Sequence, residues 1–168
     1  MKAFKSRIPD GSLAAHFLPA DHTDAFSCEA EGDAPFTADD IMVVFWTNFP
    51  PWVGSLMKLR NILVRPFGLK SDSGSAEAME DCIRAGGNYR FVSVPVKSED
   101  ETILLLSDKH LDAYLSAHTC IRGDRRIVTV TTLVSFNNRF GSVYFFFIRP
   151  FHSIIVRSML KRTIEIVS

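Results

Sequence analysis

The sequence lacks several features that usually identify a function. Its three cysteines, Cys28, Cys82 and Cys120, lie far apart and do not have the spacing of a metal site. It contains no nucleophile elbow, no phosphate-binding loop, no HExxH pair and no dinucleotide-binding fingerprint. We therefore expect free thiols, no metal site and no bound cofactor.

Net charge is missing as well. Lysine plus arginine and aspartate plus glutamate each number 19, which argues against a general nucleic-acid binder. The charges are unevenly placed, because residues 21–40 are acidic and the last thirty residues are basic. We interpret the basic stripe as the solvated face of a helix, with a membrane contact as the alternative.

Long apolar runs are also few. Residues 1–10 are positively charged, but no apolar stretch of the kind found in secretion signals follows them. The longest apolar candidate, residues 143–148, stops at Arg149, well short of the roughly twenty residues that span a bilayer. We expect no secretion signal, no transmembrane segment and a cytoplasmic protein.

Phenylalanine, by contrast, is abundant, with 14 residues. So much large apolar surface indicates either an aromatic-rich core or a cavity lined by rings. A chain of 168 residues fits one domain with a single core, which we place over residues 1–168. We expect residues 1–17 to form an N-terminal extension and residues 70–88 to form a surface excursion with a helical turn or two.

The patterns predict an α+β fold. Thr37 and Asp40 form a capping box, so a short helix should run from Ala38 to about residue 46. Pro51 suits the first position of a second helix, which should end before Pro66. A strand is expected over residues 24–29. Four β-rich runs follow at residues 89–96, 102–107, 110–121 and 125–136, and their short connections predict an antiparallel meander.

The last thirty residues predict a long closing helix. On a helical wheel, one side carries Ile148, Phe151, Ile155, Met159 and Ile166. The opposite side carries Arg157, Lys161 and Glu165. Pro150 lies inside this helix and should kink it, because proline removes one backbone hydrogen bond.

Several motifs resemble a bacterial family of unknown function placed in the START-like (SRPBCC) superfamily of polyketide cyclases, lipid-transfer domains and plant pathogenesis proteins. The resemblance covers roughly residues 18–162. It rests on the segments 51–53, 56–61, 66–70 and 110–112, on Asn138 with Gly141 and Tyr144, and on the segments 150–152 and 159–162.

The resemblance implies a helix-grip fold, in which a curved antiparallel sheet wraps around the closing helix with a cavity between them. It implies no particular chemistry. The cavity would be the default place for a bound ligand. We take the following as candidate ligand-binding residues: Trp52, Arg60, Asp112, Tyr144, Ile148 and His152.

Two of these candidates have competing interpretations. His152 falls near the centre of the apolar helix face, where it is either a neutral core histidine held by one hydrogen bond or a ligand-contacting acid or base. Arg60 is either an exposed arginine or an inward one that pairs with Asp112 or an acidic ligand.

His110, Asp112 and His118 share one face of a predicted strand. His110 and His118 would lie about 27 Å apart at ~3.4 Å per residue, so one metal ion cannot bind both. His110 with Asp112 is a weak metal pair, and a solvated sheet face is the simpler interpretation.

Three function hypotheses follow. The first is a binding module for a small apolar or aromatic molecule held between sheet and closing helix. The second is a cyclase, dehydratase or hydrolase that uses His152 with Arg60 or Asp112. The third is an interaction protein with an exposed aromatic patch, a class that includes homo-oligomers.

Overall fold

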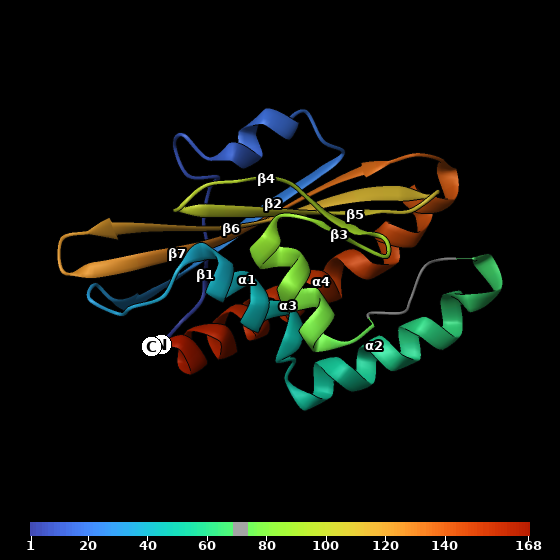
Figure 1. The fold of residues 1–168 in the computed structure, drawn as a ribbon. Helices are drawn as coiled ribbons and strands as arrows, with labels where there is room; N and C mark the ends of the chain where they lie inside the picture. Colours follow the sequence, from blue (N-terminus) through green and yellow to red (C-terminus); the bar gives the residue numbers. More distant parts are fainter. Residues whose placement is uncertain (69–73) are drawn as a thin grey trace.

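An antiparallel sheet of seven strands is the centre of the computed structural model, which describes residues 1–68 and 74–168 (Figure 1). The strand order across the sheet is β1-β2-β7-β6-β5-β4-β3. The strands are β1 (Phe4–Lys5), β2 (His22–Glu31), β3 (Asn88–Tyr89), β4 (Val92–Lys97), β5 (Glu101–Ser107), β6 (Leu111–Arg122) and β7 (Arg125–Phe136).

The predicted meander is confirmed, since β4, β5, β6 and β7 are antiparallel neighbours in chain order. The strand expected at residues 24–29 is longer, because β2 pairs with β7 from His22 to Glu31. The edge strand β1 pairs with β2 and was not predicted. The sheet is therefore wider than the meander alone.

Within residues 1–68 and 74–168, four α-helices and two short 3-10 helices accompany the sheet. They are η1 (Leu13–Phe17), α1 (Ala38–Thr47), α2 (Pro51–Val64), η2 (Arg65–Phe67), α3 (Ala76–Ala85) and α4 (Arg139–Val167). The two predicted helix starts are confirmed. Thr37 caps α1 in a complete capping box with Asp40, and Pro51 is the first residue of α2.

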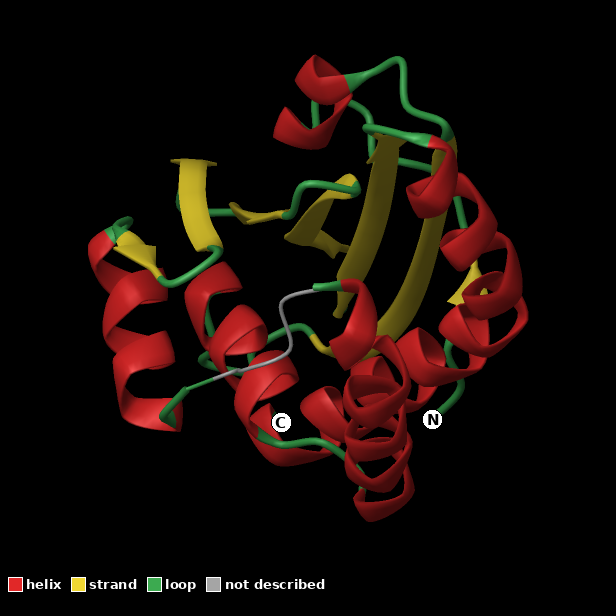
Figure 2. Cartoon of the chain, turned by 90° about the vertical axis from the view of Figure 1, so that its right-hand side faces the viewer, coloured by secondary structure: helices red, strands yellow, loops and turns green. Residues whose placement is uncertain are grey.

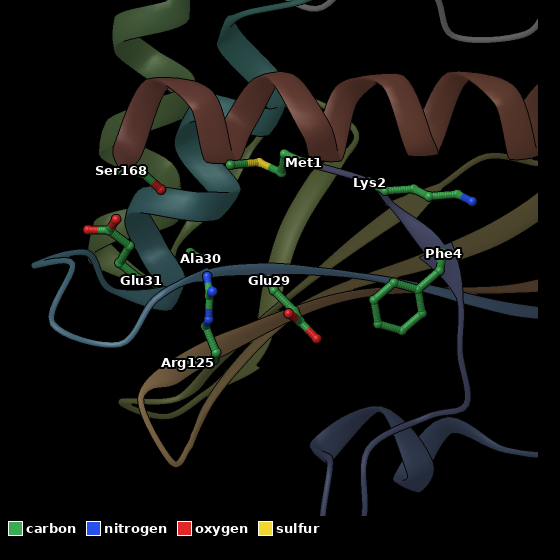
Figure 3. Close-up of a pocket in the computed structure, with 8 residues that line it drawn as sticks. All are labelled: Met1, Lys2, Phe4, Glu29, Ala30, Glu31, Arg125 and Ser168. Atoms are coloured by element: carbon green, nitrogen blue, oxygen red, sulfur yellow. The ribbon is translucent and has the colours of Figure 1, made fainter.

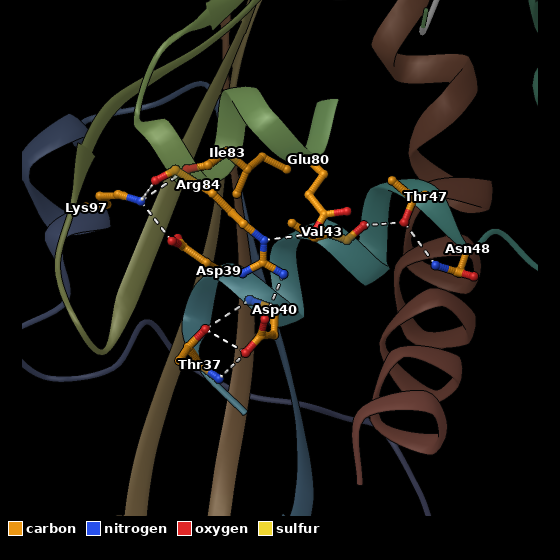
Figure 4. A network of polar contacts seen from close by, with 10 residues as sticks. All are labelled: Thr37, Asp39, Asp40, Val43, Thr47, Asn48, Glu80, Ile83, Arg84 and Lys97. Atoms are coloured by element: carbon orange, nitrogen blue, oxygen red, sulfur yellow. Dashed lines mark hydrogen bonds and ion pairs between the residues drawn. The ribbon is translucent and has the colours of Figure 1, made fainter. Parts of the chain in front are cut away.

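The expected surface excursion at residues 70–88 requires correction. Residues 70–73 lie outside the described part of the chain. The remainder includes α3, which buries Met79, Cys82 and Ile83 against α1 and is part of the core. A polar network fixes this packing: the Lys97 ammonium on β4 contacts Asp39 of α1 at 2.8 Å and the carbonyl of Arg84 in α3 at 2.7 Å (Figure 4).

The two faces of the sheet are covered differently. Helices α1, α3 and α4 cover one face, where the larger core cluster lies, and η1 covers the other (Figure 2). Glu101 is buried on the η1 side and accepts hydrogen bonds from the Ser12 and Ser116 hydroxyls and the Leu13 N–H. Residues 1–17 are thus tied to the sheet and do not extend away from it.

Helix α4 has two unlike halves. Its second half buries Ile155, Val156, Met159, Leu160 and Ile164 in the core. In its first half, most apolar side chains are exposed. Phe151, expected to be buried, is 56% exposed, and Ile166 is 46% exposed. Helical periodicity identified an apolar side but not how far the sheet covers it. The helix is continuous through Pro150, so its predicted kink stays a prediction.

Candidate functional site

A cavity of about 240 Å³ lies between the sheet and α4, and we call it the sheet–α4 cavity. Its walls come from α2, α4 and strands β5 to β7, with Phe91 before β4. Most of the lining side chains are apolar. They are Met57, Arg60, Phe91, Leu106, Ser107, Asp108, Leu111, Ala113, Thr132, Val134, Tyr144, Phe145, Ile148 and His152.

A second hollow of about 320 Å³ lies between α2 and α4, and we call it the α2/α4 groove. Its lining is almost wholly apolar: Leu56, Met57, Leu59, Arg60, Leu63, Val64, Tyr144, Phe147, Ile148, Phe151 and Ile155. The two hollows share Met57, Arg60, Tyr144 and Ile148. They are therefore neighbours separated by these side chains.

Arg60 and Tyr144 form the polar part of this shared wall. The Arg60 Nε donates a hydrogen bond of 2.7 Å to the Tyr144 hydroxyl oxygen. The guanidinium carbon also lies 5.6 Å from the centre of the Tyr144 ring, within the range of a cation–π contact. The pair links α2 to α4 and places one cationic group beside both hollows.

A buried carboxylate flanked by two histidines borders the sheet–α4 cavity. Asp24 on β2 is 7% exposed, and its Oδ2 lies 3.2 Å from Nδ1 of His152 and 3.0 Å from Nε2 of His22. His22 and Asp24 are two residues apart on one strand, so their side chains leave the same face. Helix α4 brings His152 to that face.

The protonation of Asp24 is set by these partners. Burial alone would raise the pKa of its carboxyl, but the hydrogen bonds and charges of His152 and His22 outweigh burial, so the pKa of Asp24 is below its usual value. Asp24 is therefore a carboxylate at neutral pH, and it orients the His152 imidazole at the cavity wall.

Two buried oxygen atoms at this end of the cavity have no hydrogen-bond partner within the described residues. They are Oδ1 of Asp24 and Oγ1 of Thr132. The two residues are directly paired across β2 and β7, and Thr132 lines the cavity. Buried polar atoms normally find a partner, but both oxygens are enclosed by protein atoms, so a ligand or a water molecule would reach them only if neighbouring side chains moved.

The same three side chains offer a possible donor set for a metal ion. Their ligand atoms, two imidazole nitrogens and a carboxylate oxygen, lie within 4.8 Å of one another. Both nitrogens, however, contact the same oxygen, Oδ2 of Asp24, at hydrogen-bond distance. Hydrogen bonding to Asp24 is sufficient to account for this geometry.

Four of the six candidate residues from the sequence meet in this region. Arg60, Tyr144 and Ile148 line both hollows, and His152 lines the sheet–α4 cavity. Trp52 lines neither hollow; it lies in the first turn of α2 and is 46% exposed. Helical spacing gives α2 an apolar side formed by Trp52, Leu56, Leu59 and Leu63. Much of that side faces solvent, because Trp52, Leu59 and Leu63 are exposed.

Asp112, a second candidate residue, does not line the cavity either. Leu111 and Ala113 line the cavity, so strand alternation turns Asp112 to the opposite face of β6, where it accepts a hydrogen bond of 2.6 Å from Ser107. It cannot pair with His152 or Arg60 in the cavity. The carboxylate beside His152 is Asp24, which the sequence analysis did not select.

The weak metal pair of His110 with Asp112 is also not assembled. The His110 ring contacts Asn138 through Nδ1 and the carbonyl of Phe67 through Nε2. It therefore ties the start of α4 to η2, while Asp112 contacts Ser107.

A wider hollow of about 750 Å³ lies where the two chain ends meet (Figure 3). Its lining includes Glu29, Glu31, Lys2 and Arg125, with charges of both signs. Figure 3 shows these side chains spread around a wide basin between β2 and the end of α4 and not converging on one point. We assign no site to it.

A family model described as "Protein of unknown function (DUF2867)" matches residues 17–159, which is most of the chain. No curated protein and no solved structure matches.

Proposed function

We propose that this chain, which belongs to the DUF2867 family, binds a small apolar or aromatic molecule in the sheet–α4 cavity. The observation that carries the proposal is a largely apolar hollow between a sheet and a long helix, with a few polar groups at its edges. The proposal includes a helix-grip arrangement of the START-like kind, which is consistent with the order of strands and helices.

The size of the cavity limits the ligand. An apolar cavity of about 150 Å³ holds benzene, so about 240 Å³ suits a molecule of one or two rings. The His152 imidazole at one edge favours a ligand with a polar group, such as a hydroxyl or ring N–H, at that end. Arg60 lies at the other polar edge.

The first test is to fill the cavity. Ala113→Leu adds three carbon atoms to the lining, whereas Ala85→Leu makes the same change at an exposed position near the end of α3. We expect phenol, indole or 2-naphthol to raise the melting temperature of the wild type and of Ala85→Leu, but not that of Ala113→Leu. Equal increases in melting temperature in all three proteins, or no increase in the wild type, would contradict the proposal.

A second candidate function is acid–base catalysis on a ligand in the same cavity. The observation that favours it is the imidazole of His152 at the cavity wall, hydrogen-bonded to a buried carboxylate as histidine bases often are. His152 would move the proton, Asp24 would orient it, and Arg60 would stabilise negative charge.

One variant distinguishes the two candidate functions, ligand binding and acid–base catalysis. His152→Gln keeps a polar side chain near Asp24 but cannot act as a base near neutral pH. If the protein is an enzyme, this variant binds the aromatic probes as the wild type does and loses turnover of a panel of esters and hydroxy compounds. If wild-type protein turns over none of these, only binding is supported.

A further inference from the structure

An exposed apolar surface covers α2, η2 and the first half of α4, and we call it the α2/α4 face. Its side chains are all large and more than half exposed. They are Leu59, Ile62, Leu63, Phe67, Val143, Phe146, Phe147, Phe151 and Ile154. Phe146 and Phe147 are the most exposed of them, at 72% and 68%. The α2/α4 groove opens on this face, since Leu59, Leu63, Phe147 and Phe151 line it.

Helix α2 is attached to the rest of the protein by little packing. Only Val53 and Val64 of its 14 residues are buried. In Figure 1 it lies apart from the sheet, at the edge of the molecule. An ordinary surface helix turns polar side chains outwards, but α2 turns Leu59, Ile62 and Leu63 to solvent. Contiguous exposed patches of this kind mark a contact surface.

The charge of the α2/α4 face has one sign. Residues 51–67, which form α2 and η2, contain no acidic side chain, and neither do residues 139–154 in the first half of α4. The basic side chains in these two segments are Lys58, Arg60, Arg65, Arg139 and Arg149. The whole chain has no net charge, so its acidic groups are concentrated elsewhere.

This charge decides between two partners. A second copy of the chain would bring basic groups against basic groups when the two apolar faces met. An anionic lipid surface would instead complement them, with phosphates opposite Lys58, Arg65 and Arg149 and the apolar side chains below the headgroups. We propose that the α2/α4 face docks this protein on the surface of an anionic membrane.

The proposed contact is peripheral and does not cross the bilayer. Helix α4 is long and apolar enough to cross a membrane by length and composition, and 28% of its most apolar stretch is buried. Its second half, however, packs Ile155, Leu160 and Ile164 into the core against the sheet. Only the first half is available to lipid, and it would lie in the plane of the interface. This inference does not depend on a ligand in the sheet–α4 cavity.

The test is sedimentation of the full chain with vesicles of phosphatidylcholine alone or with 30% phosphatidylglycerol added. We expect binding to the mixed vesicles that weakens with added salt, because a Debye length of about 8 Å at physiological ionic strength screens the phosphates. Phe146→Ser with Phe147→Ser should weaken binding at least about tenfold. Lys58→Gln with Arg65→Gln should weaken it roughly 25-fold, at about fivefold per basic group.

Matched controls come from the β6–β7 hairpin, where Ile121 is 62% exposed. Ile121→Ser removes an exposed apolar side chain outside the face, and Arg122→Gln with Arg125→Gln removes two basic groups there. Both controls should bind vesicles like the wild type, and thermal melting should show every variant folded.

Three results would overturn the inference. They are no binding to either vesicle, equal losses in the hairpin controls, and a lipid-free dimer that Phe146→Ser with Phe147→Ser dissociates. The last result would identify the face as an interface between copies of this chain.

Discussion

Two groups of helices in this protein differ in the direction in which their apolar side chains point. Helices α1 and α3, with the second half of α4, form a packed region in which apolar side chains point inwards. Helix α2 and the first half of α4 form an open region in which many apolar side chains point outwards. Both regions have amphipathic helices, so amphipathic character alone does not distinguish a stabilising helix from a contact surface.

Polar groups hold the packed region in place. Asp39 of α1 accepts hydrogen bonds from Lys97 and Thr102, and Arg84 of α3 pairs with Asp40 at 2.9 Å. Helix α2 has no side-chain cap at its start and no acidic residue in its first turn. The comparison indicates that stability resides in the packed region, while the open region is available for binding.

The largest expected effect contrasts two positions on α4. Leu160 is fully buried in the packed region, so Leu160→Ala should lower the free energy of unfolding by about 2–5 kcal/mol. Phe147 is 68% exposed in the open region, so Phe147→Ala should change it by less than about 0.5 kcal/mol. Urea denaturation of both variants measures the difference. Similar losses would show that the open region is not open in solution.

The boundary between the regions, where His152 meets Asp24, gives a pH-dependent prediction. The pKa of Asp24 is held below the usual 3.8, so the carboxylate stabilises the folded state above that pH, and this contribution is lost as the pH falls through the lowered value. We expect Asp24→Asn to cost about 1.5–3 kcal/mol at pH 7.

The difference between Asp24→Asn and the wild type should then shrink as the pH is lowered below 3.8. Thermal melting of both proteins from pH 7 to pH 3 follows it. A constant difference across this range would show that the two histidines do not stabilise the carboxylate.

Sequence patterns predicted where several helices and strands begin, but they did not show that α3 belongs to the core. The capping box, the proline at the start of α2 and the short connections of the meander are local signals, and local signals determine where helices and hairpins begin. The same patterns did not show which side of α2 faces the protein. Periodicity identified its apolar side, but only the positions of α4 and the sheet decide whether that side is covered.

In the candidate site as well, sequence patterns predicted one residue and missed its partner. His152 was selected because it lies on the apolar side of a helix, and it does line the cavity. Its partner Asp24 is 128 residues away in sequence, and no local pattern joins them. One signal was available, since His22 and Asp24 share a strand face at a spacing of two, as do His110 and Asp112. The sequence could not show which pair faces α4.

A smaller effect on stability is expected at Lys97, which contacts both α1 and α3 in the packed region. Lys97→Met removes the contacts to Asp39 and to the carbonyls of Ile83 and Arg84, so it should lower the free energy of unfolding by about 1–2 kcal/mol. Lys58→Met makes the same change at an exposed position of α2 and should have little effect. Urea denaturation measures the free energy of unfolding of both variants. An equal loss in the two would show that polar contacts do not stabilise the packed region more than the open region.

The smallest effect concerns the cap of α1. The Thr37 hydroxyl accepts a hydrogen bond from the Asp40 N–H, and the Asp40 carboxylate accepts one from the Thr37 N–H in return. Thr37→Ala should therefore cost about 1 kcal/mol, a typical value for an N-cap. Thr47→Ala, at the other end of the same helix, is the matched control.

The Thr47 hydroxyl donates to the carbonyl of Val43, which already takes part in the helix, so its loss should cost less. The melting temperatures of the two variants show which substitution destabilises the protein more. If Thr47→Ala proves the more harmful, the start of α1 is fixed by packing of the helix and not by its cap, and the polar groups in Figure 4 contribute less than the comparison assigns to them.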